Sequence, residues 1–149
     1  MLEGFEESTF CHEGVTHPVF SAGQGPGVLI MHEVPGLYPA VIEFAERVVA
    51  AGFRVALPEL FGTPGRPLSA GYALGQIGRA CIGREFHVLA SRRSSPITVW
   101  LRALCRQLHA ECGGPGVGAI GMCLTGNFAL SLMVDPWVMA PVLSQPSLP

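Results

Sequence analysis

The residues best suited to chemistry lie around Cys123, in the run Gly-Met-Cys-Leu-Thr-Gly at 121–126. An apolar segment, 117–122, leads directly into the cysteine, and a turn of small residues and an amphipathic segment follow it. This layout predicts a nucleophile elbow, a sharp strand-to-helix turn that raises the nucleophile above a sheet. Glycines flank the cysteine because so tight a turn leaves no room for larger side chains. A thiolate there could attack a carbonyl carbon, while the next backbone N–H binds the oxyanion.

Glu33 is the second candidate, because it follows the continuous apolar run 27–31. Open α/β sheets bind ligands at the carboxyl ends of their strands, so Glu33 should share an edge of the sheet with Cys123. A solvated loop acid is the alternative for Glu33, and a core cysteine is the alternative for Cys123. We interpret His32 as a strand-end histidine with satisfied hydrogen bonds. A helix N-terminus directly after Cys123 would favour its thiolate.

Arg84 is a third candidate, after a Gly- and Pro-rich stretch at 61–83 that predicts a long functional loop. A guanidinium could bind a substrate carboxylate there, although a surface ion pair is an equal alternative. The Gly-rich run 116–121 fits the spacing of a dinucleotide-binding loop. A helix precedes that run, however, the strand lies inside it, and no acidic residue follows at the required distance, so a nucleotide cofactor is disfavoured.

Composition narrows the classes of function. Only 13% of the 149 residues are charged and 49% are apolar, which is typical of parallel strands buried on both faces. A net charge of −2 without a basic cluster excludes a nucleic-acid partner. The uncharged run 112–134 could span a membrane by length, but its glycines and proline argue against this. The acidic N-terminal residues lack an apolar signal segment, so we expect a cytoplasmic protein. Five cysteines without a C-x-x-C pair predict neither a disulfide framework nor a metal site, and we expect no cofactor.

The order of elements predicts the fold. Strands alternate with helices after an initial hairpin, which is typical of a mostly parallel, doubly wound sheet with helices on both faces. No linker divides the chain, so residues 1–149 should form one α/β domain. The expected elements are a β-hairpin over 5–20, strands at 27–31, 53–57, 117–122 and 138–143, helices at 40–51, 97–112 and 124–134, and a long loop with at most a short helix over 61–83.

Several of these segments resemble the dienelactone hydrolases. The matching runs are Met-His-Glu at 31–33, Pro-Gly-Leu at 35–37, the helical run at 43–47, Leu-Pro-Glu-Leu at 57–60 and Gly-Met-Cys-Leu at 121–124. They follow the order and spacing of that family over almost the whole chain. The resemblance implies an α/β-hydrolase fold and a thiol nucleophile that opens a small lactone or cleaves a carboxylic ester.

The resemblance also implies roles for particular residues. Cys123 matches the nucleophile, and Glu33 matches the glutamate that contacts the resting thiol and helps to generate the thiolate. The backbone N–H groups of Val34 and Leu124 match the two oxyanion donors. An arginine binds the substrate carboxylate in this family, and Arg84 lies in the corresponding region.

Two features depart from the family. Thr125 stands where glycine is usual, and after Cys123 the sequence contains one acidic residue, Asp135, and no histidine. In the family an aspartate and a histidine on later strands complete the triad, so we expect this chain to be the N-terminal part of a longer hydrolase. An apolar sheet edge would then be exposed and would favour self-association. The alternatives are a catalytically incomplete α/β domain with a redox-sensitive or merely structural cysteine, or a nucleotide-binding domain.

Overall fold

The computed structural model describes residues 2–82 and 95–146, with side chains over 2–76 and 95–146. Strands and helices alternate along most of the chain. In order, the elements are β1 (Glu6–His12), β2 (Val15–Ala22), β3 (Gly27–Met31), α1 (Pro39–Ala50), β4 (Arg54–Pro58), α2 (Ala70–Ile82), α3 (Pro96–Cys112), β5 (Val117–Met122), a 3-10 turn η2 (Cys123–Thr125), α4 (Gly126–Leu132) and β6 (Val138–Ser144).

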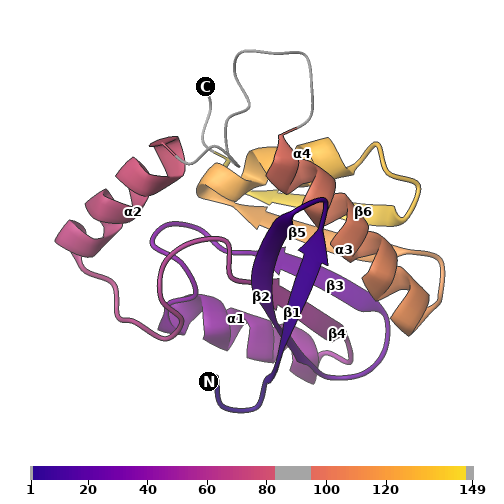
Figure 1. Ribbon diagram of the computed structural model, residues 1–149. Helices are drawn as coiled ribbons and strands as arrows, with labels where there is room; N and C mark the ends of the chain where they lie inside the picture. Colours follow the sequence, from indigo (N-terminus) through magenta and orange to yellow (C-terminus); the bar gives the residue numbers. More distant parts are fainter. Residues whose placement is uncertain (1, 83–94, 147–149) are drawn as a thin grey trace.

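These strands form one six-stranded sheet in the order β1-β2-β4-β3-β5-β6 (Figure 1). The four strands β4, β3, β5 and β6 run parallel to one another. Strand β2 pairs antiparallel with β4, and β1 pairs antiparallel with β2. Glu13 and Gly14 form the hairpin turn with φ values of 49° and 79°, the sign that a two-residue hairpin favours. The expected hairpin and the mostly parallel sheet are both confirmed.

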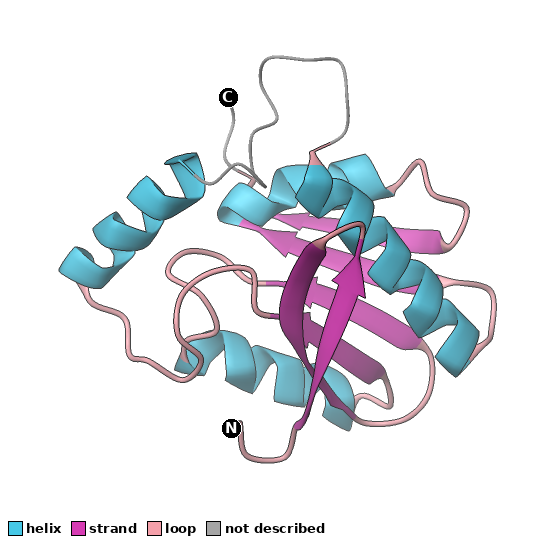
Figure 2. Ribbon diagram, in the orientation of Figure 1, coloured by secondary structure: helices cyan, strands magenta, loops and turns pink. Residues whose placement is uncertain are grey.

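Helices cover both faces of the sheet (Figure 2). Leu29 and Met31 of β3 point to one face, where they join the core formed with α3 and α4. Val28 and Ile30 alternate with them and pack with α1 on the opposite face. All the residues of β3 are buried, which explains why this strand is a continuous apolar run. The expected α/β class is therefore confirmed.

The signals that begin and end two of the helices act as expected. Ser95 caps α3, because its hydroxyl accepts a hydrogen bond from the N–H of Thr98, and Pro96 occupies the first helical position. After α1, Gly52 takes a φ of 92°, which the left-handed end of a helix favours.

Two expectations about helices need correction. The segment 61–83 contains α2, a helix of 13 residues, where a loop with at most a short helix was expected. Its glycines hid the helix, since they lower helix propensity. The segment 124–134 is helical only to Leu132, and begins with the 3-10 turn before seven residues of α4. Among the described residues, no helix combines the length and apolar character needed to cross a bilayer.

Candidate active site at the carboxyl edge of the sheet

Cys123 lies directly after β5 in an unusual backbone conformation. Its φ is 53°, in the left-handed region that residues other than glycine rarely adopt. Such conformations carry strain and cluster at active sites, where the surrounding structure must hold them. The side chain is half-buried at the carboxyl edge of the sheet. The expected strand-to-helix turn is therefore present, with Cys123 at its tip.

The glycines of this turn are required by close backbone contacts. A Cβ atom on Gly121 would lie 2.3 Å from the carbonyl oxygen of Thr125, and one on Gly126 would lie 2.9 Å from Cβ of Pro146. The chain therefore folds back onto Gly121 within four residues. This is the physical reason that small residues precede and follow the nucleophile in the expected pattern.

Thr125 fits the turn although glycine is usual at this position in the family. Its φ and ψ are −79° and −9°, a right-handed conformation that any residue adopts, so the turn does not demand glycine here. The side chain is fully buried, and its hydroxyl lies 2.9 Å from the N–H of Met122 and 2.9 Å from the carbonyl of Met31.

The register of the sheet brings Glu33 and Cys123 to the same edge. Met31 of β3 pairs with Gly121 of β5, and each candidate residue lies two positions beyond its strand's member of that pair. Glu33 is half-buried. The arrangement thus places a carboxylate and a thiol after adjacent parallel strands, as the sequence predicted.

Tyr38 is a residue of the site that sequence reasoning missed. Its hydroxyl donates a hydrogen bond to the carboxylate of Glu33. Burial, together with that hydrogen bond and the negative charge of Glu33, raises the pKa of Tyr38 to about 12, so the hydroxyl remains a donor at neutral pH. Glu33 and Tyr38 are five residues apart, and this spacing alone does not indicate a contact, because the contact depends on the path of the loop between Glu33 and α1.

His32 has the structural role that was expected. The ring is fully buried, its Nδ1–H donates to the carbonyl of Glu33 at 3.0 Å, and Nε2 accepts from the N–H of Leu60 at 2.9 Å. Burial lowers the pKa of His32 to about 4, so the ring is neutral at physiological pH. It joins the segment that carries Glu33 to the segment that follows β4.

The two expected oxyanion donors lie in segments of defined geometry. Leu124 follows Cys123 in the 3-10 turn, and Val34 lies in a turn closed by a hydrogen bond of 2.8 Å from the N–H of Gly36 to the carbonyl of Glu33. Arg84 lies outside the described residues. No cluster of three metal-ligating side chains occurs within 2–76 and 95–146.

Two concavities of the surface lie elsewhere. One, of about 220 Å³, is lined by residues of the β1–β2 hairpin, β4 and α3, and the other lies at the amino end of β4. Arg54 and Glu111 contribute to both, and Cys123 contributes to neither. Surface concavity therefore does not identify the candidate site. The backbone conformation of Cys123 is the stronger indication.

Comparison with protein families found a match to the dienelactone hydrolase family over residues 14–144. The match includes both Glu33 and Cys123. No curated protein matches the sequence.

Several solved structures with low sequence identity have a similar fold. A protein from Klebsiella pneumoniae described as a candidate dienelactone hydrolase has a TM-score of 0.69 at 15% identity, over 97% of this chain and 60% of its own. A promiscuous, dienelactone hydrolase-like phosphotriesterase from metagenomic libraries has a TM-score of 0.59 at 20% identity, over 86% and 52%. A variant of Vigna radiata epoxide hydrolase has a TM-score of 0.59 at 22% identity, over 92% and 37%. The chain thus spans between about a third and three fifths of these proteins, and the likeness supports the fold.

Proposed function

This chain belongs to the dienelactone hydrolase family. We propose that it acts in a hydrolase in which the thiolate of Cys123 attacks a small lactone or carboxylic ester. The observation that carries the proposal is the φ of 53° at Cys123, held by the close approach of Thr125 to Gly121. The chain maintains a strained backbone at the one residue of the turn that can act as a nucleophile.

The first half of the proposed reaction forms an acyl-enzyme. The carboxylate of Glu33 takes the proton from Sγ of Cys123, and the thiolate forms a bond to the carbonyl carbon of the substrate. The resulting oxyanion accepts hydrogen bonds from the N–H groups of Val34 and Leu124. When the C–O bond of the ester or lactone breaks, the leaving oxygen takes the proton from Glu33. Tyr38 supports these steps by donating a hydrogen bond to Glu33.

The second half returns the thiol. A water molecule adds to the thioester carbon and gives a proton to Glu33, the C–S bond breaks, and Sγ of Cys123 recovers the proton. The product is a free carboxylic acid. As in the related family, we assign Arg84 to binding a carboxylate that the substrate carries beside its ester or lactone group, which would favour small anionic esters and lactones.

The acyl-enzyme is the species to detect. Incubating the protein with p-nitrophenyl acetate should acetylate Cys123, as seen by peptide mass mapping, with one equivalent of p-nitrophenol released in a burst. Cys123→Ala should abolish both signals. Cys11→Ala is the control, because Cys11 is an exposed thiol on β1 that reagents can reach without an active site.

Two results would separate the proposal from its alternative. Equal release of p-nitrophenol by the wild type and Cys123→Ala would contradict the assignment of the nucleophile. If Cys123 is not acetylated but dilute peroxide converts it to the sulfenic acid ahead of Cys11, the redox-sensitive reading is supported instead.

A further inference from the structure

The buried hydroxyl of Thr125 lies where strands β3 and β5 separate. Regular pairing between these strands ends at Met31 and Gly121. One residue further along, the Thr125 hydroxyl lies 2.9 Å from the N–H of Met122 and 2.9 Å from the carbonyl of Met31, a residue 94 positions away in the sequence. A side chain thus continues the link between the two strands beyond their last backbone pair.

The Thr125 hydroxyl acts both as an acceptor and as a donor of hydrogen bonds. The hydroxyl oxygen accepts from the N–H of Met122, and its single proton can go to the carbonyl of Met31 or to that of Met122, each 2.9 Å away. Thr125 is fully buried, so water cannot replace the hydroxyl without rearrangement. Removing it would take this partner from the part-buried N–H of Met122 and from the buried carbonyl of Met31.

The backbone atoms held by this hydroxyl lead directly to the proposed reacting groups. Met122 immediately precedes Cys123 and Leu124, whereas Met31 lies three residues before Val34. On the other side of β3, His32 ties the same segment to Leu60 after β4. The segment that carries Val34 is therefore tied on both sides, and Thr125 supplies the tie on the side of the thiol.

We propose that Thr125 is a positioning residue that fixes the separation between the two oxyanion donors, the N–H groups of Val34 and Leu124. This inference rests on the proposed function. A carbonyl oxygen that becomes an oxyanion must meet both donors at once, so a shift of one strand end relative to the other should slow acylation. Simple alkylation of the thiol develops no oxyanion, so the same shift should leave it almost unchanged.

Two reactions of the same thiol test this proposal. Acylation of Cys123 by p-nitrophenyl acetate and alkylation by iodoacetamide should be followed by mass mapping of the Cys123 peptide in the wild type, Thr125→Val and Thr125→Ser. Thr125→Val keeps the shape but loses the hydroxyl, and should lower the acylation rate on the order of 10- to 100-fold, the scale of a misplaced catalytic group. Its alkylation rate should stay close to that of the wild type, and Thr125→Ser should restore acylation.

Thr98→Val is the matched control. Thr98 is another buried threonine, on α3, whose hydroxyl lies 2.8 Å from that of Ser95. Thr98→Val should lower the melting temperature, because a buried hydrogen bond is lost. It should not change the ratio of the acylation rate to the alkylation rate at Cys123. If Thr125→Val changes both rates equally, or changes neither, the proposal is overturned. If Thr125→Val does not fold, Thr125→Ala compared with Thr125→Ser decides by the same ratio.

Amide hydrogen exchange separates this proposal from the proposed function. If the wild type is not acylated at Cys123, the proposed function is wrong. The positioning role of Thr125 is then tested by the amide hydrogen exchange rates alone. Thr125→Val should speed exchange at both Val34 and Leu124, whereas Thr98→Val should not. Unchanged exchange at these two amides would overturn the positioning role.

Discussion

Cys123 combines a reactive side chain with a backbone conformation that residues other than glycine rarely adopt. Its neighbours make that combination stable: Gly121 admits the returning chain and Thr125 ties the end of the strand. Glu33, at the same edge, has its carboxylate oriented by Tyr38. At the scale of single residues, the candidate site has a thiol on a strained backbone and, after the adjacent strand, a carboxylate that accepts a hydrogen bond from Tyr38.

Glu33→Gln should separate the two effects of that carboxylate. Glu33 is the proposed acceptor of the thiol proton, so the substitution should change the pH dependence of Cys123 alkylation. Acylation by an ester should fall by roughly 10²- to 10⁴-fold, because a proton acceptor is lost. Both are measured by mass mapping of the Cys123 peptide across pH. If the alkylation profile is identical in the two proteins, Glu33 is not coupled to the thiol.

His32 predicts a pH dependence of stability. Its pKa is about 4 when folded and 6.5 in the unfolded chain, so the unfolded state binds more protons between these values. The contribution to the free energy of unfolding is therefore complete above pH 6.5 and is lost as the pH falls to 4, by about 3 kcal/mol. Urea unfolding at both ends of this window should show that loss in the wild type and not in His32→Gln. His12→Gln, on β1, should retain it.

Sequence reasoning identified the residues whose type and position suffice to indicate a role. Cys123, Glu33 and His32 each follow a buried strand, and their placement at its carboxyl end could be predicted from that fact alone. Tyr38 and the hydroxyl of Thr125 could not be predicted in the same way. Their hydrogen bonds depend on how the loops turn after β3 and β5, which no spacing along the sequence determines.

At the scale of elements, buried strands and capped helices were predictable, whereas α2 was not. β3 and β5 are apolar runs bounded by turn residues, and α3 begins at Ser95-Pro96. Helix α2 stands apart from the sheet in Figure 1 and contains Gly71 and Gly75, around which a Cβ atom would meet nothing within 4 Å. Glycines in a helix lower its propensity and interrupt the periodic apolar pattern, so the sequence carries little signal of this helix.

Two glycine substitutions should therefore act in opposite directions. Gly75→Ala should raise the free energy of unfolding by about 0.5–1 kcal/mol, because alanine favours the helix and nothing obstructs its Cβ. Gly121→Ala should lower it by about 1–3 kcal/mol, because its Cβ would overlap the carbonyl of Thr125. Urea unfolding measures both. A destabilising Gly75→Ala would contradict the open surroundings of α2, and a neutral Gly121→Ala would contradict the tight elbow.

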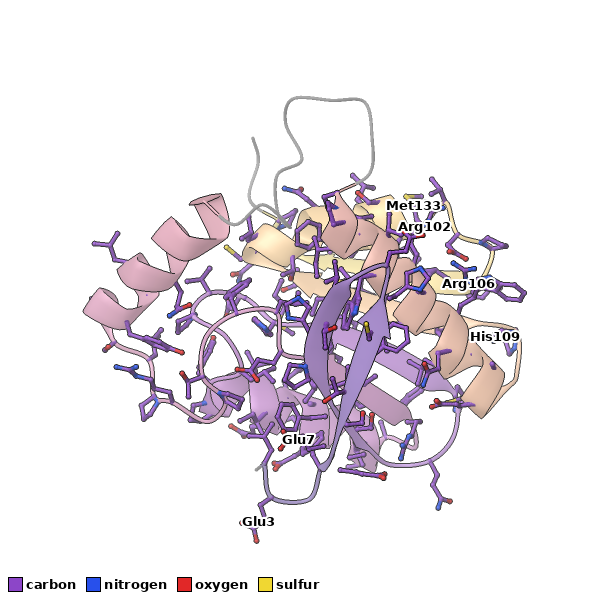
Figure 3. The ribbon with its side chains drawn as sticks, in the orientation of Figure 1. Glu3, Glu7, Arg102, Arg106, His109 and Met133 are labelled. Atoms are coloured by element: carbon purple, nitrogen blue, oxygen red, sulfur yellow. The ribbon has the colours of Figure 1, made fainter. Side chains whose placement is uncertain are left out.

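At the scale of the whole molecule, the two edges of the sheet differ. Among the strands of the described residues, β1 forms one edge and β6, paired to β5, forms the other. Figure 3 shows Arg102, Arg106 and His109 along α3 with Met133 nearby, so this flank carries both basic and apolar side chains. The large exposed apolar side chains of α4, β6 and the segment between them are Leu130, Met133, Val134, Trp137, Met139, Val142 and Leu143.

We expect this chain to self-associate through β6. An unpaired edge strand with apolar side chains is a template for pairing with a second copy. Sedimentation velocity should show a mass that rises with concentration, and Val142→Lys on β6 should reduce that rise. Leu74→Lys is the control, because Leu74 is also apolar and is more exposed than Val142, but lies on α2. Equal effects of the two substitutions would show that the association does not use β6.

The order of the strands has a consequence for biosynthesis. Strands β1 to β4 leave the ribosome together and pair with one another, whereas β5 reaches its place beside β3 only after α3 has been made. Closing a loop of about 90 residues costs on the order of 4 kcal/mol of chain entropy, so this central pairing should form late. A growing chain thus carries Glu33 long before it carries Cys123. Pulse labelling of the thiol during translation should show acyl reactivity only after β5 has docked beside β3.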